Sequence, residues 1–143
     1  MAKKKNQKVR EVMTAEPMTI EASTPLATAA RVMRDGDIGS VIVMADGSVQ
    51  GILTDRDIVI RAVAEGRDPA ETNVAEICSG ELVCVQAEDS VTEAIRLMRE
   101  KTVRRLPVVD GRRPVGIVSL GDLAVERDRD SVLGEISAAN PNR

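Results

Sequence analysis

Two short polar motifs, TDRD at residues 54–57 and SLGD at residues 119–122, offer the clearest binding chemistry in the sequence. Each places a hydroxyl three residues before a carboxylate, directly after an apolar run. A helix that begins at the hydroxyl presents free backbone N–H groups and the positive end of its dipole, which suit a phosphate. The carboxylate can accept hydrogen bonds from both hydroxyls of a ribose. We therefore expect the first motif to contact a phosphate through Thr54 and a ribose through Asp57.

The same spacing also has a purely structural interpretation. A hydroxyl at a helix N-cap with an acidic residue three positions later is a variant of the capping box, in which each side chain bonds the other residue's N–H. Asp57 and Asp122 would then stabilise helix starts without touching a ligand. One residue can also do both, so the sequence leaves the two interpretations open.

The composition argues against most kinds of catalysis. The chain has no His, Phe, Tyr or Trp, so it offers no imidazole as a base or metal ligand and no ring to stack on a nucleobase. It also lacks a phosphate-binding loop of the P-loop type and a nucleophile–base pair. We expect a protein that is not an enzyme, with no metal and no cofactor other than a nucleotide ligand. Cys78 and Cys84, the only cysteines, are expected to be buried free thiols.

Charge and hydropathy narrow the partners and the compartment. The net charge of −3 argues against nucleic acid as a partner. No apolar run reaches the length of a membrane span, and the N-terminus lacks the apolar core of a signal peptide. We therefore expect a cytoplasmic protein that does not bind membranes.

The chain contains an internal repeat. Identical residues recur 65 positions apart, as Met33 and Met98 or Asp57 and Asp122 do, and the register holds without a gap. A constant offset over this length indicates two copies of one supersecondary unit.

Each copy begins with a predicted strand and helix. The strands are expected at 18–20 and 82–85. The helices that follow are expected to have Thr24 and Asp89 as N-caps and to end near Gly36 and Lys101.

A hairpin and a second helix complete each copy. Two apolar runs joined by Asp-Gly are a strong hairpin signal, and the runs are apolar on both faces, so both faces should be covered. Thr54 and Ser119 are the expected N-caps of the closing helices. The predicted strands are 41–44, 49–53, 106–109 and 115–118.

The expected fold class is α/β (α+β), with two β-α-β-β-α repeats packed about a pseudo-twofold axis into one module, because neither copy can bury its apolar faces alone. The expected segments are a flexible N-terminus at 1–8, repeat 1 at 9–65, a linker at 66–73, repeat 2 at 74–127 and a C-terminal helix and tail at 128–143.

Three motifs resemble the CBS-domain family: VREVMTAEPMTI, DIGSVIVMADGSVQGILTDRDI and VRRLPVVDGRRPVGIVSLGDL. The resemblance covers about residues 9–127 and implies a stand-alone CBS pair. It implies a regulatory module that binds an adenosine-containing ligand such as AMP, ADP or ATP in the cleft between its repeats. It also implies a disc-shaped homodimer and a protein partner. The family's Ser/Thr-x-x-Asp motif maps onto Thr54/Asp57 and Ser119/Asp122.

The resemblance also assigns basic residues to the phosphate. Arg104 and Arg105 precede the central strand of the second copy, where similar domains contact a nucleotide held by the other repeat, and Arg suits phosphate through its forked donors. The matching residues of the first copy, Gly39 and Ser40, carry no charge. We therefore expect the site built on Thr54, with Arg56 and a borrowed arginine, to bind phosphate better than the one built on Ser119.

Adenine would lie between aliphatic side chains such as Ile38, with backbone groups of the first strand, around Thr19, reading its amino edge. The alternative function is a scaffold for dimerisation or protein interaction whose sites hold no ligand.

Overall fold

The computed structural model describes residues 7–78 and 82–127. The chain divides into two compact units that do not coincide with the two sequence repeats. Unit 1 consists of the described parts of Met1–Pro17 and Val83–Asn142, and unit 2 of the described part of Met18–Leu82. Each unit is described separately below.

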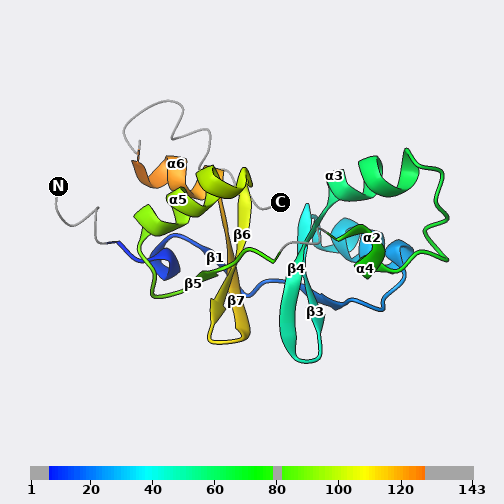
Figure 1. Cartoon of the computed structure of the whole chain (residues 1–143). Coiled ribbons are helices and arrows are strands. Elements are labelled where there is room, and N and C mark those ends of the chain that lie inside the picture. The colour runs from blue at the N-terminus through cyan, green and yellow to red at the C-terminus, as the bar shows by residue number, and fades with distance from the viewer. Residues whose placement is uncertain (1–6, 79–81, 128–143) are drawn as a thin grey trace. The chain divides into compact units, whose positions relative to one another are not determined.

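Unit 2 is a three-stranded sheet in the order β2-β3-β4. β2 and β3 are parallel neighbours joined by helix α2, and β3 and β4 form an antiparallel hairpin (Figure 1). The core between α2 and the sheet includes Leu26, Val41 and Leu53, all fully buried. The elements are β2 (Thr19–Glu21), α2 (Leu26–Gly36), β3 (Ser40–Ala45), β4 (Ser48–Thr54), α3 (Asp55–Ile58), the π-helical turn η2 (Val59–Val63) and α4 (Val74–Ile77).

Unit 1 repeats this pattern and adds one strand. Its sheet has the order β1-β7-β6-β5, in which β5 and β6 are parallel, β6 and β7 form a hairpin, and β1 pairs antiparallel with β7. The elements are the 3-10 turn η1 (Val9–Glu11), β1 (Thr14–Ala15), β5 (Val85–Gln86), α5 (Val91–Lys101), β6 (Arg105–Asp110), β7 (Arg113–Ser119) and α6 (Leu120–Arg127). The predicted β-α-β-β-α order is confirmed in both copies.

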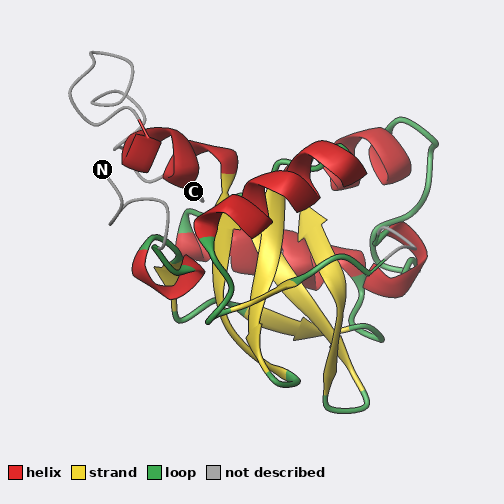
Figure 2. Ribbon diagram, turned by 60° about the vertical axis from the view of Figure 1, so that its left-hand side comes forward, coloured by secondary structure: helices red, strands yellow, loops and turns green. Residues whose placement is uncertain are grey.

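Both predicted hairpins form (Figure 2), although the second turns at Gly111–Arg112, one residue later than the predicted Asp110–Gly111. Asp46 and Gly47 have φ values of 52° and 76°, and positive φ at both central residues is the signature of a type I′ turn. The second hairpin has positive φ only at Gly111, the first of its two turn residues. These turns match the twist of the flanking strands, so they set the strand register.

The leading turn of each repeat packs in the core of the unit formed by the other repeat. Val9 is fully buried in the core of unit 1, and its N–H donates to the Asp89 carbonyl at 2.8 Å. Val74 and Ile77 of α4 are likewise fully buried in the core of unit 2, and the Val74 N–H donates to the Thr24 carbonyl at 2.8 Å. The two repeats therefore exchange their first segments.

Ion pairs add to the attachment of η1. Lys8 Nζ lies 2.7 Å from Glu88 Oε1, and Arg10 pairs with the other oxygen of the same carboxylate. The hydrogen bond from Lys8, followed by the charge of Arg10, lowers the pKa of Glu88. All three side chains are about half exposed, so this contribution is small beside the burial of Val9.

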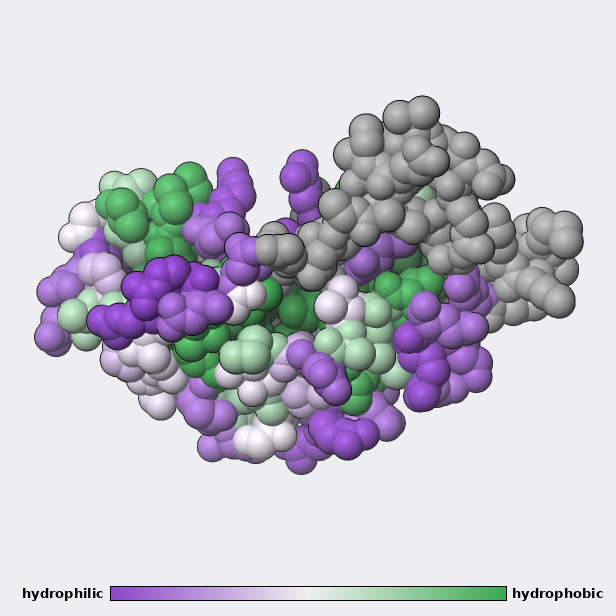
Figure 3. Space-filling model, turned by 180° about the vertical axis from the view of Figure 1, so that it is seen from behind, coloured by the Kyte–Doolittle hydropathy of each residue, from purple (hydrophilic) through white to green (hydrophobic). Residues whose placement is uncertain are grey.

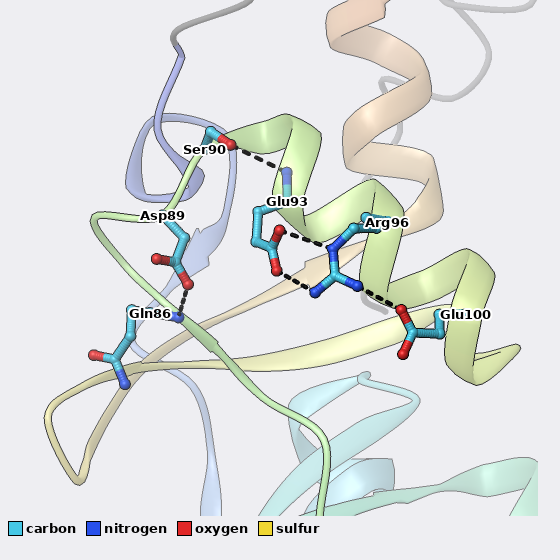
Figure 4. A network of polar contacts seen from close by, with 6 residues as sticks. All are labelled: Gln86, Asp89, Ser90, Glu93, Arg96 and Glu100. Atoms are coloured by element: carbon cyan, nitrogen blue, oxygen red, sulfur yellow. Dashed lines mark hydrogen bonds and ion pairs between the residues drawn. The ribbon is translucent and has the colours of Figure 1, made fainter.

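The expected helix ends are confirmed, but two expected N-caps are wrong. α2 ends at Gly36 and α5 at Lys101. The N-cap of α2 is Pro25 rather than Thr24, because backbone carbonyls of the 66–73 segment accept from the first N–H groups of α2 instead of a side chain. The N-cap of α5 is Ser90, whose hydroxyl accepts from Glu93 N, while Asp89 accepts from Gln86 N (Figure 4).

A chain of charged side chains follows the exposed face of α5 (Figure 4). Arg96 donates to both carboxylate oxygens of Glu93, at 2.6 and 3.0 Å, and also pairs with Glu100. Pairs at this spacing support an isolated helix by a few tenths of a kcal/mol each. The network therefore adds only a small amount to the stability of α5 itself.

One predicted strand begins later than expected. The strand expected at 82–85 is β5 (Val85–Gln86), whose two residues pair with Val108 and Val109. Leu82 is half exposed, so its apolar character does not reflect a place in the sheet. The helix and tail expected at 128–143 and residues 1–6 of the flexible N-terminus expected at 1–8 lie outside the described residues. The other two residues of that N-terminus are bonded to unit 1, since the Gln7 carbonyl accepts from the Val91 N–H at 2.8 Å and Lys8 pairs with Glu88.

The η2 turn leaves apolar side chains at the surface of unit 2 (Figure 3). Val59, Ile60 and Val63 are 54%, 47% and 60% exposed.

None of the helices in the described residues combines the length and apolar character needed to cross a bilayer.

Gly116→Ala should loosen the contact between β1 and β7. A Cβ at this position would lie 2.8 Å from the Thr14 carbonyl oxygen and 2.5 Å from the Met13 sulfur. We expect a loss of about 1–3 kcal/mol in the free energy of unfolding, because overpacking forces the backbone to shift. Urea unfolding followed by circular dichroism measures it, since the chain has no aromatic fluorophore.

Gly36→Ala is the matched control. Its Cβ would meet only the flexible Ile38 side chain, at 3.5 Å, and alanine favours a helix over glycine. Its stability should be unchanged or higher, and an equal loss in both variants would contradict the close approach of β1.

Candidate functional site

The TDRD motif forms a closed capping box at the junction of β4 and α3. Thr54 Oγ1 accepts from the Asp57 N–H at 3.1 Å, and Asp57 Oδ2 accepts from the Thr54 N–H at 2.9 Å. The structural interpretation of this motif is therefore confirmed. It does not exclude binding, because the box uses one of the two carboxylate oxygens of Asp57.

The SLGD motif forms the same box at the junction of β7 and α6. Ser119 Oγ accepts from the Asp122 N–H at 3.1 Å, and Asp122 Oδ2 accepts from the Ser119 N–H at 2.8 Å. Thr54 and Ser119 cap the closing helices as predicted. The two junctions are thus equivalent in backbone geometry.

The prediction of free N–H groups at the start of α3 is wrong. The Asp55 N–H donates to the Gly39 carbonyl at 3.0 Å, and the Arg56 N–H donates to Asp55 Oδ1 at 2.8 Å. The Asp57 N–H is held by Thr54, as described above. α3 is also only four residues long before it continues as η2. A phosphate near this motif would therefore need side-chain cations rather than backbone donors.

Asp57 retains one oxygen for a further partner. Its Oδ1 lies 4.0 Å from Arg61 Nε, beyond hydrogen-bonding distance, and its side chain is 20% exposed. An ionised carboxylate offers about four acceptor positions. The box and a ribose hydroxyl can therefore share this side chain.

Ser40 is the most unusual polar residue of unit 2. It is directly opposite Thr54 in the β3–β4 ladder, so the two side chains lie on the same face of the sheet. Ser40 is only 2% exposed, and its hydroxyl has no hydrogen-bond partner among the described residues. A buried polar group without a partner costs about 1–3 kcal/mol and calls for a specific explanation, such as an unseen water or ligand.

The equivalent position in unit 1 has the same property. Arg105 is opposite Ser119 in the β6–β7 ladder, and its Nε is buried without a partner within the described part of the chain. The Leu120 N–H donates to the Arg104 carbonyl at 2.8 Å, as the Asp55 N–H does to Gly39. The start of α3 therefore contacts the Gly39–Ser40 segment, and the start of α6 contacts the Arg104–Arg105 segment.

The remaining predicted residues are less closely grouped. Thr19 is exposed and pairs with Ile42, two residues along β3 from Ser40. Ile38 is half-buried and packs on the core of unit 2. Arg56 is exposed and forms no ion pair with a described residue.

A residue in the left-handed region of backbone conformation precedes each polar segment, Gly39–Ser40 and Arg104–Arg105. Asp37 and Thr102 end α2 and α5 with φ values of 52° and 54°. Asp tolerates this conformation, whereas it is unusual for β-branched Thr. The two positions are equivalent in the repeat, so both copies enter their central strand by the same turn.

Both cysteines are free thiols, as expected, but they are half-buried rather than buried. Burial raises the pKa of the Cys84 thiol, which disfavours the reactive thiolate near neutral pH. Cys78 Sγ lies 3.6 Å from the Ile52 carbonyl oxygen. No group of three metal-ligating side chains occurs among the residues that the structure describes.

Sequence reasoning identified the polar residues but missed one neighbour relation. It assigned Arg104 and Arg105 to a ligand at Thr54, whereas within unit 1 the ladder places Arg105 beside Ser119. Counting back from the Gly111–Arg112 turn would pair Arg105 with Val118, and the β-bulge between Val108 and Val109 shifts the partner by one residue to Ser119. A contact between these arginines and a ligand at Thr54 remains a prediction.

Comparison with known proteins assigns the family. The CBS domain model matches residues 9–63 and 74–128, so the chain belongs to the CBS-domain family as a tandem pair. It is 41% identical over 119 residues to the CBS domain-containing protein YhcV of Bacillus subtilis, covering 83% of this chain and 84% of that protein.

Two further proteins show the same fold. Hypoxic response protein 1 of Mycobacterium tuberculosis is 38% identical over 116 residues, covering 80% of this chain and 81% of that protein. Its crystal structure, described with two coordinated zinc ions, has a TM-score of 0.74, covering 82% of this chain and 97% of that one. The CBS pair of MJ0100, in complex with 5′-methylthioadenosine and S-adenosyl-L-methionine, has a TM-score of 0.76 and covers 87% and 98%; at 23% identity it shows the fold alone.

Ser40→Ala and Thr54→Ala should have opposite effects on the ligand-free protein. Removing the unpartnered Ser40 hydroxyl should leave the free energy of unfolding unchanged or raise it by about 1 kcal/mol. Removing the Thr54 cap should lower it by about 1 kcal/mol. Urea unfolding by circular dichroism measures both, and a comparable loss in Ser40→Ala would show that its hydroxyl has a partner.

Proposed function

We propose that this CBS pair is a regulatory module that binds an adenosine-containing ligand such as AMP, ADP or ATP between its repeats. The observation that carries the proposal is the buried, unpartnered hydroxyl of Ser40 on the face that also carries Thr54. A ligand hydroxyl would satisfy it. The complex of the MJ0100 pair supports the proposal only to the extent that the shared fold has room for adenosine compounds.

In this proposal the ribose binds beside the capping box of unit 2. Asp57 Oδ1 accepts from a ribose hydroxyl while Oδ2 keeps its bond to Thr54. Ser40 supplies a second hydroxyl that donates or accepts. Binding then requires no rearrangement of the helix start.

The adenine ring would lie against aliphatic side chains, because the chain has no aromatic residue. Ile38 adjoins the Gly39–Ser40 segment, and the exposed backbone around Thr19 offers donors and acceptors to the amino edge. We therefore expect weaker binding of the base than in proteins with an aromatic stacking platform.

Phosphate recognition would rest on arginine side chains. The motif in unit 2 contributes Arg56, and the original prediction adds Arg104 or Arg105. Within unit 1, however, Arg105 adjoins Ser119, and Leu120 has no carboxylate to engage the Gly121 N–H as Asp55 engages Arg56. This observation favours a second candidate, in which the anion binds at Ser119.

The alternative function is a scaffold without a ligand. The closed capping boxes support it, because they explain Asp57 and Asp122 without any binding role. The same fold would then serve a protein partner or a homodimer. The exposed Val59, Ile60 and Val63 support a homodimer, since contiguous apolar patches commonly mark protein interfaces.

A thermal-shift panel with AMP, ADP, ATP, S-adenosylmethionine and NAD tests the proposed function. A ligand that binds only the folded state, at 100-fold excess over its Kd, should stabilise it by about 2.7 kcal/mol. Circular dichroism gives the readout. We expect a shift with at least one adenosine compound and its loss in Asp57→Ala, measured against that variant's own ligand-free midpoint.

Asp89→Ala is the control for loss of an acidic cap. Asp89 accepts from the Gln86 N–H at 3.0 Å and has no place in the proposed site. Its ligand-free midpoint should fall while its ligand-induced shift persists. No shift with any compound in the unmodified chain would favour the scaffold.

Calorimetry with AMP separates the two placements of the phosphate. Arg105→Gln is combined with Asp57→Ala and with Asp122→Ala, and each pair is treated as a double-mutant cycle. We expect one AMP per chain and coupling of Arg105 to Asp57, of about 1 kcal/mol or more. Coupling to Asp122 instead would place the anion at Ser119, and equal occupancy of two sites would contradict the asymmetry.

A further inference from the structure

An open cavity of about 330 Å³ lies on unit 1 beside the start of α6. Its apolar wall includes Ile95 and Met98 of α5, Val103 and Leu120. Arg99 and Arg104 also line it, and neither forms an ion pair with any residue in the described part of the chain. This cavity, called here the α5–α6 groove, is an apolar surface edged by two free cations.

Leu120 makes the groove a candidate docking surface. It is 54% exposed at the first position of α6, where the other copy has the acidic Asp55. A large apolar side chain exposed beside an apolar groove is typical of a docking surface. Thr102 also lines the groove, and Arg104 is shared with the predicted phosphate contacts, but the proposed ribose contacts Ser40 and Asp57 are not among the lining residues.

The chain itself provides a matching segment. Residues 128–143 follow α6 and lie outside the described residues. Val132, Leu133 and Ile136 recur at the spacing of one helical face. The charged residues of 130–138 are Asp130 and Glu135, both acidic and so opposite in charge to the two arginines of the groove.

We propose that the segment 130–138 docks in the α5–α6 groove of its own chain. Val132, Leu133 and Ile136 pack on the apolar wall, and the acidic side chains lie near Arg99 and Arg104. The docking shares Arg104 with the predicted phosphate contacts and uses no other residue of the proposed nucleotide site.

The connection is long enough. α6 has eight residues, so its ends lie about 12 Å apart along the axis. The five residues from Arg127 to Val132 can span up to about 17 Å when extended. Because a short tether gives an effective concentration in the mM range, the chain's own segment outcompetes a second copy at ordinary protein concentrations.

Hydrogen–deuterium exchange of the full chain tests the proposal. Leu133→Asp places a charge on the apolar face of the segment and changes no residue of either described core. We expect exchange in 95–104 and 120–123 to become roughly tenfold faster, the factor for losing one buried leucine side chain. Ser131→Asp, on the opposite face, is the matched control and should leave this exchange unchanged.

Reversing the charge of one groove arginine and of one segment carboxylate provides a second, independent test. Arg99→Glu should speed exchange in the same peptides, and adding Glu135→Arg should restore the slow exchange. A general loss of stability in Arg99→Glu would not be repaired by a change in the segment.

Three results would overturn the proposal. Unchanged exchange in Leu133→Asp would show that the segment does not cover the groove. Protection that weakens on dilution, together with a lower mass in light scattering for Leu120→Asp, would assign the groove to a second copy. Equal effects of Leu133→Asp and Ser131→Asp would show that charge alone, and not the apolar face, is responsible.

Discussion

The exchange of leading segments between the two repeats is the contact on which both units depend. Val9 is fully buried against the helix and strands of the second repeat, and Val74 and Ile77 are fully buried against those of the first. A repeat cut out at its sequence boundaries would leave an apolar gap and carry an exposed apolar turn. Each core therefore requires a segment of the other copy to close, which explains why the two repeats occur together.

The strand-to-helix junctions are the second constraint, and they join stability to the candidate site. Each capping box fixes a hydroxyl and a carboxylate beside the first residue of the neighbouring strand, by way of the contacts from Asp55 to Gly39 and from Leu120 to Arg104. Because the boxes are complete without a ligand, the proposed site would need no rearrangement of the helix starts. Binding would then cost little ordering entropy. It would give partners to the remaining acceptor positions of the carboxylates and to the unpartnered atoms of Ser40 and Arg105.

The two junctions share a backbone and differ in chemistry. Ser40 and Arg105 occupy equivalent positions, yet one is a neutral hydroxyl and the other a cation. The Asp55 carboxylate accepts from the Arg56 N–H, whereas Leu120 has no side-chain acceptor for the equivalent Gly121 N–H. Leu120 instead adds an exposed apolar side chain. The two copies thus share their backbone geometry at the junctions and differ there in side-chain charge and polarity.

The sequence by itself determined the repeat, the order of elements, the two hairpins and the helix ends at Gly36 and Lys101, because periodicity, Asp-Gly pairs and capping residues act over short distances. Only the tertiary structure decided that Pro25 and Ser90 are the N-caps, that β5 begins at Val85 and that the leading turns are exchanged. These outcomes depend on backbone partners far away in the chain, such as the 66–73 carbonyls that accept from α2. The same holds for the site: residue types identified Asp57 and Ser40, but burial and strand register revealed that the Ser40 hydroxyl lacks a partner and that Arg105 adjoins Ser119.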